Sequence, residues 1–227
     1  MSIRLPFWAT LMSVLGIIVL CTLGSWQLQR LAWKTEIIAK LDAAYESENS
    51  KAIDIANFED SDFTYGRVSG TFLPQKALLL GPKTKDKKIG YDLIVPLKQK
   101  KATILINMGW TEWELEELPI YHLKNKWVWF EGLARAPGWN SFTPENVPEE
   151  ELWFKPDIDN IATIKNLKNP APFMLYAEHA SHKFDASFPN NARWSPNNNH
   201  LQYAIFWFIM ALALAVIYGL RFLRKQG

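Results

Sequence analysis

Two long uncharged apolar runs, one near each end of the chain, constrain its fold more than any other feature. The first covers residues 5–29, with its most apolar part between Pro6 and Leu23, and the second covers Leu201–Leu220. An α-helix rises about 1.5 Å per residue, so about twenty apolar residues cross the roughly 30 Å hydrocarbon layer of a bilayer. We therefore expect two transmembrane helices that flank the rest of the 227-residue chain.

The first run has an alternative interpretation as a cleaved signal peptide, with Arg4 as its charged n-region. A retained helix is favoured because the run exceeds the usual apolar core of roughly 7–15 residues, and because the sequence LCTLGS contains no small-x-small cleavage site. Leu20, rather than a small residue, precedes Cys21, which disfavours a lipid anchor. Cys21 is the only cysteine, so the chain forms no internal disulfide.

The basic residues near the two ends predict the orientation of the chain. Four of them lie in the terminal tails: Arg4, Arg221, Arg224 and Lys225. The chain has a formal charge of +2, so residues 30–200 carry a net charge of −2. Positive tails favour the cytoplasmic side, and long loops translocate largely regardless of their own charge. We expect both termini in the cytoplasm and the middle segment outside, without an electrostatic footprint for nucleic acid.

The first helix is expected to continue beyond the membrane. After Leu23 a helical pattern runs to Tyr45 and puts Trp26, Arg30 and Trp33 on one face. Tryptophan favours the headgroup layer, and arginine can extend its charge to that layer. The simplest interpretation of this face is an interfacial anchor.

The middle segment changes to short apolar runs separated by Gly, Pro and Lys-rich breaks, which is typical of strands. The expected strands are YGRVSGTF (65–72), ALLLG (77–81), GYDLIVPL (90–97), TILINMGW (103–110), WVWFEGLAR (127–135) and PFMLYAEHA (172–180). PKTKDKK is expected to be a solvated loop that turns a hairpin, and PDIDNIATIKNL a short helix with aspartates at its start. FPNNARWSPNNNH is the expected linker into the second span.

These elements predict a membrane protein with two transmembrane helices flanking an extracytoplasmic α+β domain rich in antiparallel strands. The expected segments are a cytoplasmic N-tail at 1–5, a transmembrane helix at 6–25, the extracytoplasmic domain at 26–200, a second transmembrane helix at 201–220 and a basic cytoplasmic C-tail at 221–227.

No short motif nominates a catalytic site. G-x-S-x-G is absent, and no Gly-rich loop precedes a helix. His179 and His182 of HASH would share a face on a helix but diverge on a strand that runs into a loop, and no third ligand lies close in sequence. The acid-rich EWELEE and PEEE are typical of solvated helix starts. We expect no enzyme activity.

His200, at the start of the second span, is the histidine with the most informative surroundings. On a helix it shares a stripe with Tyr203, Trp207 and the small residues Ala204 and Ala211. Small residues let a neighbouring helix approach closely, so the two spans are expected to pair. The first span offers a matching small stripe: Ala9, Ser13 and Gly16.

Two interpretations of His200 stay open from spacing alone. A neutral imidazole flanked by Tyr203, Trp207 and the indole of Trp26 could ligate haem iron, with Arg30 or Arg193 facing the propionates. Alternatively, His200 is only a polar residue in the headgroup zone, where an asparagine caps the helix. The candidate caps are Asn198 and Asn199.

Several segments together resemble the surfeit locus 1 family of cytochrome oxidase assembly proteins. GSWQLQRLAWK is similar to that family's Gly-x-Trp-Gln motif followed by arginine, here Gly24, Trp26, Gln27 and Arg30. The segments that follow in the family's order are GYDLIVPL, INMGW, FEGLARAP, FTPENVPEEELWFKPDID and NNHLQYAIFWF. The resemblance departs where Met108 replaces a common arginine before Gly-Trp and where Thr-Glu replaces Val-Pro after it. No role of that arginine is carried over.

The resemblance implies a non-enzymatic haem chaperone that assists haem a insertion into, or stabilisation of, subunit I of cytochrome oxidase in respiratory complex IV biogenesis. Its implied metal ligand is His200, with Tyr203, Trp207, Trp26 and Arg30 as further haem-binding candidates and haem a as a transient cofactor. The implied partners are subunit I and other assembly or haem a synthesis proteins.

Other functions stay open beside this one, namely a haem-independent membrane scaffold or a membrane-tethered extracytoplasmic enzyme. The absence of a presequence before Pro6 favours a bacterial inner membrane over a mitochondrial one.

Overall fold

The computed structural model describes residues 6–46, 52–55, 58, 63–118, 120–182, 184 and 188–222. The chain forms two compact units: a helix pair from residues 1–39 and 195–227, and a sheet domain from Lys40 to Trp194. The expected cytoplasmic N-tail at 1–5 and residues 223–227 of the expected C-tail lie outside the described residues.

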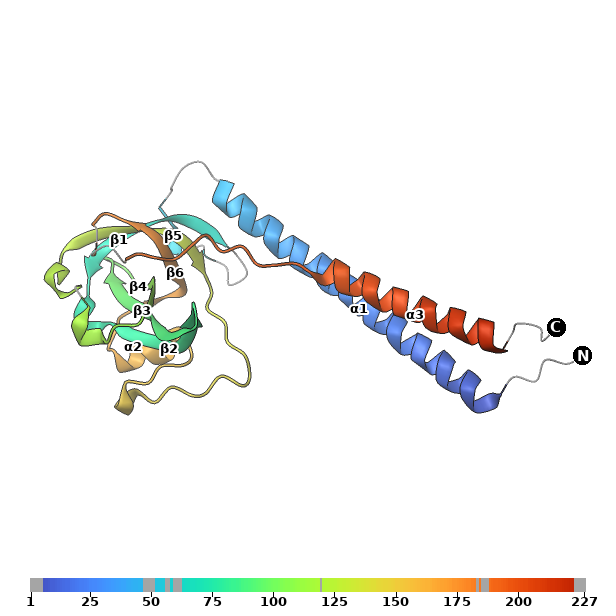
Figure 1. The fold of residues 1–227 in the computed structure, drawn as a ribbon. Coiled ribbons are helices and arrows are strands. Elements are labelled where there is room, and N and C mark those ends of the chain that lie inside the picture. Colours follow the sequence, from blue (N-terminus) through green and yellow to red (C-terminus); the bar gives the residue numbers. More distant parts are fainter. Residues whose placement is uncertain are drawn as a thin grey trace, which may run out of the picture. The chain divides into compact units, whose positions relative to one another are not determined.

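The helix pair consists of α1 (Phe7–Glu46) and α3 (His200–Phe222), each long and apolar enough to cross a membrane. The most apolar windows of the two helices have mean hydropathies of 2.1 and 2.2. In Figure 1 the two helices run alongside each other, with the start of α1 and the end of α3 at the same end of the pair. Helix α1 has 40 residues and continues past the apolar run to Glu46, as the sequence predicts. Two apolar helices therefore flank a sheet domain.

Small residues line the contact between the two helices. Ala204 and Ala211 are 1% and 5% exposed, so the alanine stripe of α3 faces α1 as predicted. A Cβ atom added to Gly16 would lie 3.0 Å from Leu214, and one added to Gly24 would lie 2.8 Å from the Phe208 ring. The absence of a side chain at Gly24 therefore gives the Phe208 ring room to pack directly against α1.

The sheet domain is a six-stranded sheet in the order β1-β5-β6-β4-β3-β2 (Figure 1). Strand β1 also pairs with β3, through Thr71 with Lys98 and Phe72 with Leu97, so the sheet bends back on itself. All pairings are antiparallel except that of β4 with β6. The strands are β1 (Thr64–Phe72), β2 (Leu78–Lys85), β3 (Lys88–Lys98), β4 (Thr103–Thr111), β5 (Trp127–Arg135) and β6 (Pro170–Ala180).

Apolar residues cover both faces of the central strands. Alternate residues point to opposite faces of a strand, so Ile104 and Ile106 join one buried cluster while Leu105 joins the other. The first cluster contains Phe72, Phe130 and Phe184, whose ring centroids lie 5.2–5.9 Å apart. The second cluster includes Leu78, Leu80, Ile94, Trp153, Ile161 and Met174.

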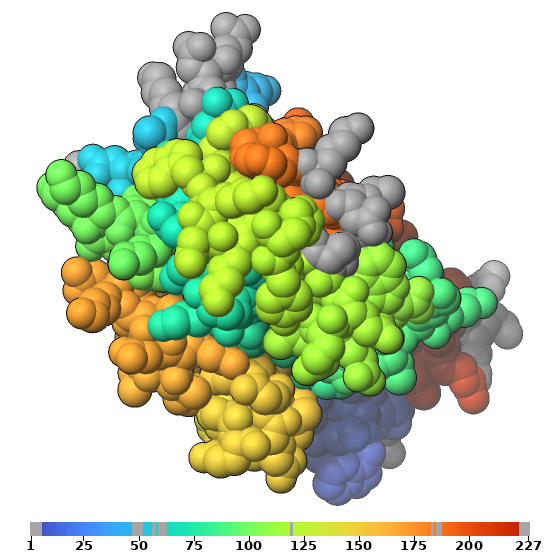
Figure 2. All heavy atoms as spheres, turned by 90° about the vertical axis from the view of Figure 1, so that its left-hand side faces the viewer, coloured from blue at the N-terminus to red at the C-terminus, as the bar shows by residue number. Residues whose placement is uncertain are grey.

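Helix α2 (Ile158–Ile164) forms where the sequence predicts a short helix. The Asp157 side chain caps it by accepting a hydrogen bond from the backbone N–H of Asn160 at 3.1 Å. Figure 2 shows the segment that leads into α2 and α2 itself, coloured yellow to orange, together on one side of the domain. The short 3-10 helices are η2 (Pro74–Lys76), η3 (Leu115–Glu117), η4 (Tyr121–Leu123) and η5 (Pro148–Glu150).

One sequence expectation needs correction. PKTKDKK does turn a hairpin, but most of it is strand: β2 continues to Lys85 and β3 begins at Lys88. The turn contains only Asp86 and Lys87, whose φ angles are 51° and 65°. Two successive positive φ angles are typical of the two-residue hairpin turn whose twist matches that of the paired strands. The turn is therefore short, and the lysines before it belong to β2 with their side chains exposed.

Candidate functional site

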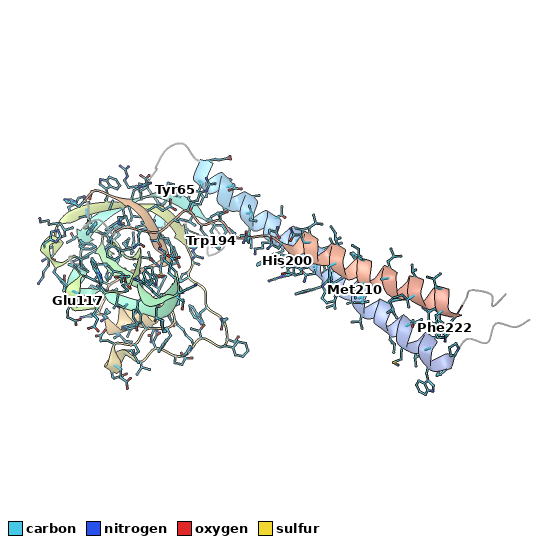
Figure 3. The ribbon with its side chains drawn as sticks, in the orientation of Figure 1. Tyr65, Glu117, Trp194, His200, Met210 and Phe222 are labelled. Atoms are coloured by element: carbon cyan, nitrogen blue, oxygen red, sulfur yellow. The ribbon has the colours of Figure 1, made fainter. Side chains whose placement is uncertain are left out.

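His200 is the first residue of α3, and its imidazole meets a side chain of α1. Its Nδ1 atom lies 2.7 Å from Oε1 of Gln27, and both residues are half-buried. Figure 3 shows His200 at the start of α3, beside α1. The two residues are 173 positions apart in sequence, so the helix pairing alone brings them together.

A second contact holds the chain just before α3. The Asn198 amide donates a hydrogen bond to the Thr35 hydroxyl at 3.2 Å, and this hydroxyl donates to the Leu31 carbonyl at 2.8 Å. The Asn198 side chain is therefore used across the pair and does not cap α3, so of the two candidate caps Asn199 stays a prediction. Oδ1 of Asn198 is buried and finds no hydrogen-bond donor among the described residues.

The Gln27 contact determines which imidazole nitrogen can bind a ligand. A carbonyl oxygen accepts hydrogen bonds, so Nδ1 of His200 carries the proton and donates a hydrogen bond to Oε1 of Gln27. In the neutral ring Nε2 then carries the lone pair. Within the described part of the chain no hydrogen bond reaches Nε2. The arrangement can therefore offer one nitrogen donor to a metal or to an acidic hydrogen.

The residues around His200 lie on one flank of the helix pair. Residues 11 positions apart on a helix differ by only about 20° in direction, so Gly16 and Gln27 share one stripe of α1. His200, Trp207 and Leu214 share one stripe of α3. Gln27 meets His200 and Gly16 is next to Leu214, so these two stripes face each other on the same flank.

The aromatic candidates differ in how closely they accompany His200. Trp207 is half-buried on the same stripe, and Tyr203 lies one turn after His200 with 55% of its side chain exposed. Trp26 is 50% exposed and sits about 100° around α1 from Gln27, away from the contact between the helices. The structure thus joins His200 to Gln27 and puts Tyr203 and Trp207 on the same flank of α3, one and two turns further along, while Trp26 points away from the contact between the helices.

The two arginines considered for propionates have different surroundings. Arg30 lies one turn after Gln27 and is exposed, with its guanidinium 4.4 Å from the centre of the Trp33 ring. Arg193 belongs to the sheet domain, where it donates to Asp42 at 2.9 Å and stacks 4.4 Å above the Tyr45 ring. Of these two arginines, Arg30 is therefore the one that belongs to the helix pair.

The histidines and clefts of the sheet domain are weaker candidates for a functional site. His179 lies near the end of β6, while His182 follows the strand and makes a 2.9 Å contact with Ser181, so the pair does not share a helix face. In the described parts of the chain no group of three possible metal ligands occurs. The sheet domain has open clefts, including one of about 520 Å³ lined by Arg135, Trp139 and Tyr176.

Three phenols in the sheet domain have raised pKa values, and two of them, Tyr45 and Tyr65, have rings only 5.1 Å apart. Burial, together with the carboxylates of Glu178 and Glu131, raises the pKa of Tyr65 to about 12. Burial also raises the pKa of Tyr45, whose hydroxyl donates to Glu178 at 2.8 Å and accepts from the Trp194 N–H at 3.1 Å. Both phenols are protonated at neutral pH and act as structural hydrogen-bond donors.

Comparison with known proteins determines the family. The sequence profile of the SURF1 family matches residues 14–212, which include the whole sheet domain, most of α1 and the first half of α3. The chain belongs to the SURF1 family. This agrees with the resemblance found in the sequence.

Curated relatives of the SURF1 family match most of this chain. A SURF1-like protein of Dictyostelium discoideum is 28% identical, over 89% of this chain and 92% of the relative. A SURF1-like protein of Rickettsia bellii is 27% identical, over 88% and 85%. The Surfeit locus protein 1 of Gallus gallus is 24% identical, over 89% and 72%. These matches extend across nearly the full length of the chain, so they concern the helix pair as well as the sheet domain.

Gln27 is the site residue that sequence reasoning missed as a partner of His200. It appeared only as part of the Gly-x-Trp-Gln motif shared with the SURF1 family. One signal was available: Gln27 is a polar amide in an uncharged run, and such groups near a membrane core are costly unless they find a partner. The identity of the partner could not be obtained from spacing within α1.

Proposed function

We propose that this SURF1-family protein is an assembly factor for a haem-copper cytochrome oxidase, which holds haem a at His200 and assists its insertion into subunit I. Membership in the family supports the general role in oxidase assembly. The observation that carries the finer proposal is the 2.7 Å contact of His200 Nδ1 with Gln27. It commits one ring nitrogen and leaves the other available for iron.

The chemistry of the surrounding residues fits this cargo. Haem a supplies an iron that accepts a nitrogen lone pair, and a flat macrocycle with a long apolar tail. Trp207 and Tyr203 follow His200 on the same flank and offer ring faces and apolar contact area. Arg30, one turn beyond Gln27, can pair with a propionate. The proposed haem site therefore consists of His200, Trp207, Tyr203 and Arg30, with Trp26 at its edge.

The proposal involves ligation and partner contact, without catalysis. A protein that hands its cargo on must bind it reversibly, and a single protein ligand is released more easily than two. The proposed partners are subunit I, which receives the haem, and the proteins that make haem a. All of them are contacts within or beside the membrane.

The proposed setting is a bacterial inner membrane, with the sheet domain on the extracytoplasmic side. Arg221 in the last turn of α3 supports cytoplasmic termini, because positive residues favour that side. Relatives in Rickettsia species are compatible with a bacterial location. In this orientation His200 lies where α3 enters the membrane from outside.

The first prediction concerns His200→Ala. The full chain, purified in detergent from cells that make haem a, should carry haem in the wild type and lose it in the variant, because the nitrogen donor is gone. An absorption spectrum measures the haem, and circular dichroism checks that helix content is unchanged. His182→Ala, at an exposed position just after β6 and outside the helix pair, is the control and should keep the haem.

Two outcomes would count against this proposal. If His200→Ala retains the wild-type haem spectrum, His200 is not the ligand. If the wild type carries no haem while haem a is being made, the protein is better explained as a haem-independent scaffold that stabilises the oxidase through helix packing.

A further inference from the structure

The partner of His200 is an uncharged amide, although histidine ligands in proteins are often held by carboxylates. Gln27 reaches the imidazole because the two helices approach closely one turn earlier, where Gly24 packs under Phe208. Asn198 and Thr35 hold the chain on the other side of His200. Gln27 thus contacts the ring itself, while the Asn198–Thr35 bond fixes the chain just before it, and both contacts use neutral groups.

We infer that Gln27 is a positioning residue, which holds His200 in the tautomer with the proton on Nδ1 and keeps Nε2 a moderate donor from which a ligand can be released. This inference rests on the proposed role of His200 in holding haem. It adds that Gln27, the acceptor of the Nδ1 hydrogen bond, determines how tightly His200 binds the haem iron.

The physical reason is the effect of the acceptor on the ring. A hydrogen bond from Nδ1–H moves electron density toward Nε2 and makes it a better donor to a metal. A carboxylate acceptor does this more strongly than an amide, because hydrogen bonds to a charged acceptor are roughly twice as strong. An amide therefore orients the ring and selects the tautomer without producing the strongest donor. That combination suits a protein that must give its ligand away.

The geometry makes the role of Gln27 separable from helix packing. Gln27 is half-buried, so leucine of similar size can replace it without creating a large cavity, while losing the acceptor. Glutamate has the same shape and keeps an acceptor of higher strength. The two variants therefore change the hydrogen bond in opposite directions at nearly constant volume.

The first test needs no haem. Nitrogen NMR of the full chain in detergent, with ¹⁵N-labelled histidine rings, distinguishes protonated from bare ring nitrogens; the loss of the signals in His200→Gln assigns them. The wild type should have the proton on Nδ1 of His200. Gln27→Leu should move the population toward the form protonated on Nε2, which an unrestrained neutral imidazole prefers. A wild type protonated on Nε2 would overturn the inference.

The second test measures release. Haem a extracted from purified oxidase is loaded on each variant, and its transfer to apomyoglobin is followed by absorbance. Gln27→Leu should weaken haem binding roughly 10–100-fold, the usual effect of removing the group behind a metal ligand. Gln27→Glu should bind more tightly and release several-fold more slowly. Gln29→Leu, an exposed glutamine on the same helix, is the matched control and should behave as wild type.

The outcomes separate this inference from the proposed function. If wild type binds haem through His200 and both Gln27 variants release it at the wild-type rate, the role of Gln27 is wrong while the haem site stands. If the tautomer shifts as expected but no form of the protein binds haem, Gln27 still orients His200 and the haem proposal fails.

Discussion

Among single residues, Tyr45 and Tyr65 form a pair of phenols whose pKa values are both raised. The rings of Tyr45 and Tyr65 lie 5.1 Å apart, and both hydroxyls are close to carboxylates, Tyr45 to Glu178 and Tyr65 to Glu131. Tyr45 lies in the last turns of α1 and Tyr65 in β1, so the pair ties the end of the helix to the sheet. The protonated phenol is the form that this arrangement stabilises.

The second prediction is therefore a loss of stability at alkaline pH. Tyr65 has a folded pKa of about 12 against an ordinary value of 10.0, so its contribution is complete below pH 10 and is lost as the pH rises through about 12. Urea unfolding of the full chain in detergent, at several pH values from 8 to about 12, measures this loss. Tyr65→Phe cannot ionise, so its stability should fall less steeply above pH 10. Identical slopes in the two proteins would contradict the shifted pKa.

Among the elements, the linker that leads to α3 is attached to the sheet by asparagines. The Asn190 side chain accepts from the Trp110 N–H at 2.9 Å and donates to the Trp110 carbonyl at 2.8 Å, as a neighbouring strand would. The Asn191 amide donates to the carbonyls of Asn107 and Ala177, on β4 and β6. The linker therefore satisfies backbone groups where the pairing of β4 with β6 ends.

The third prediction tests this attachment. Asn190→Ala leaves the N–H and the carbonyl of Trp110 without their partner, which costs roughly 1–3 kcal/mol when such groups are buried. Trp110 is only half-buried, so we expect the low end of that range. Urea unfolding followed by tryptophan fluorescence measures it. Asn197→Ala, at an exposed position of the same linker, should leave the midpoint unchanged; equal midpoints in both variants would mean that the linker does not stabilise the sheet.

The elements also explain which parts of the structure the sequence could predict. Strand β5 has the bounds expected from WVWFEGLAR, and α2 begins at the predicted aspartate, because local periodicity and capping determine such elements. The parallel pairing of β4 with β6 could not be predicted, since it joins strands separated by β5 and α2. The same limit applies to Gln27, whose partner lies at the other end of the chain.

At the scale of the whole molecule, the proposed topology gives the fourth prediction. Phe142 in the sheet domain is 95% exposed. A Phe142→Cys variant, with Cys21 replaced by serine, should react with a membrane-impermeant maleimide in intact spheroplasts, because the sheet domain is expected outside. A green fluorescent protein fused after Gly227 should fluoresce, as it does only in the cytoplasm. Labelling of Phe142→Cys only after lysis would put the sheet domain on the cytoplasmic side and exclude the proposed orientation.

The close packing at Gly16 and Gly24 has a consequence for where a ligand of His200 can lie. The helices are in direct contact there, so a flat ring system has no space between them and must rest along the outer flank, with one edge toward lipid. A ligand bound on this outer flank can exchange with another membrane protein within the plane of the bilayer. If the cargo is haem a, as proposed, a neighbouring membrane protein could accept it within the bilayer, and the apolar haem tail would not cross an aqueous phase.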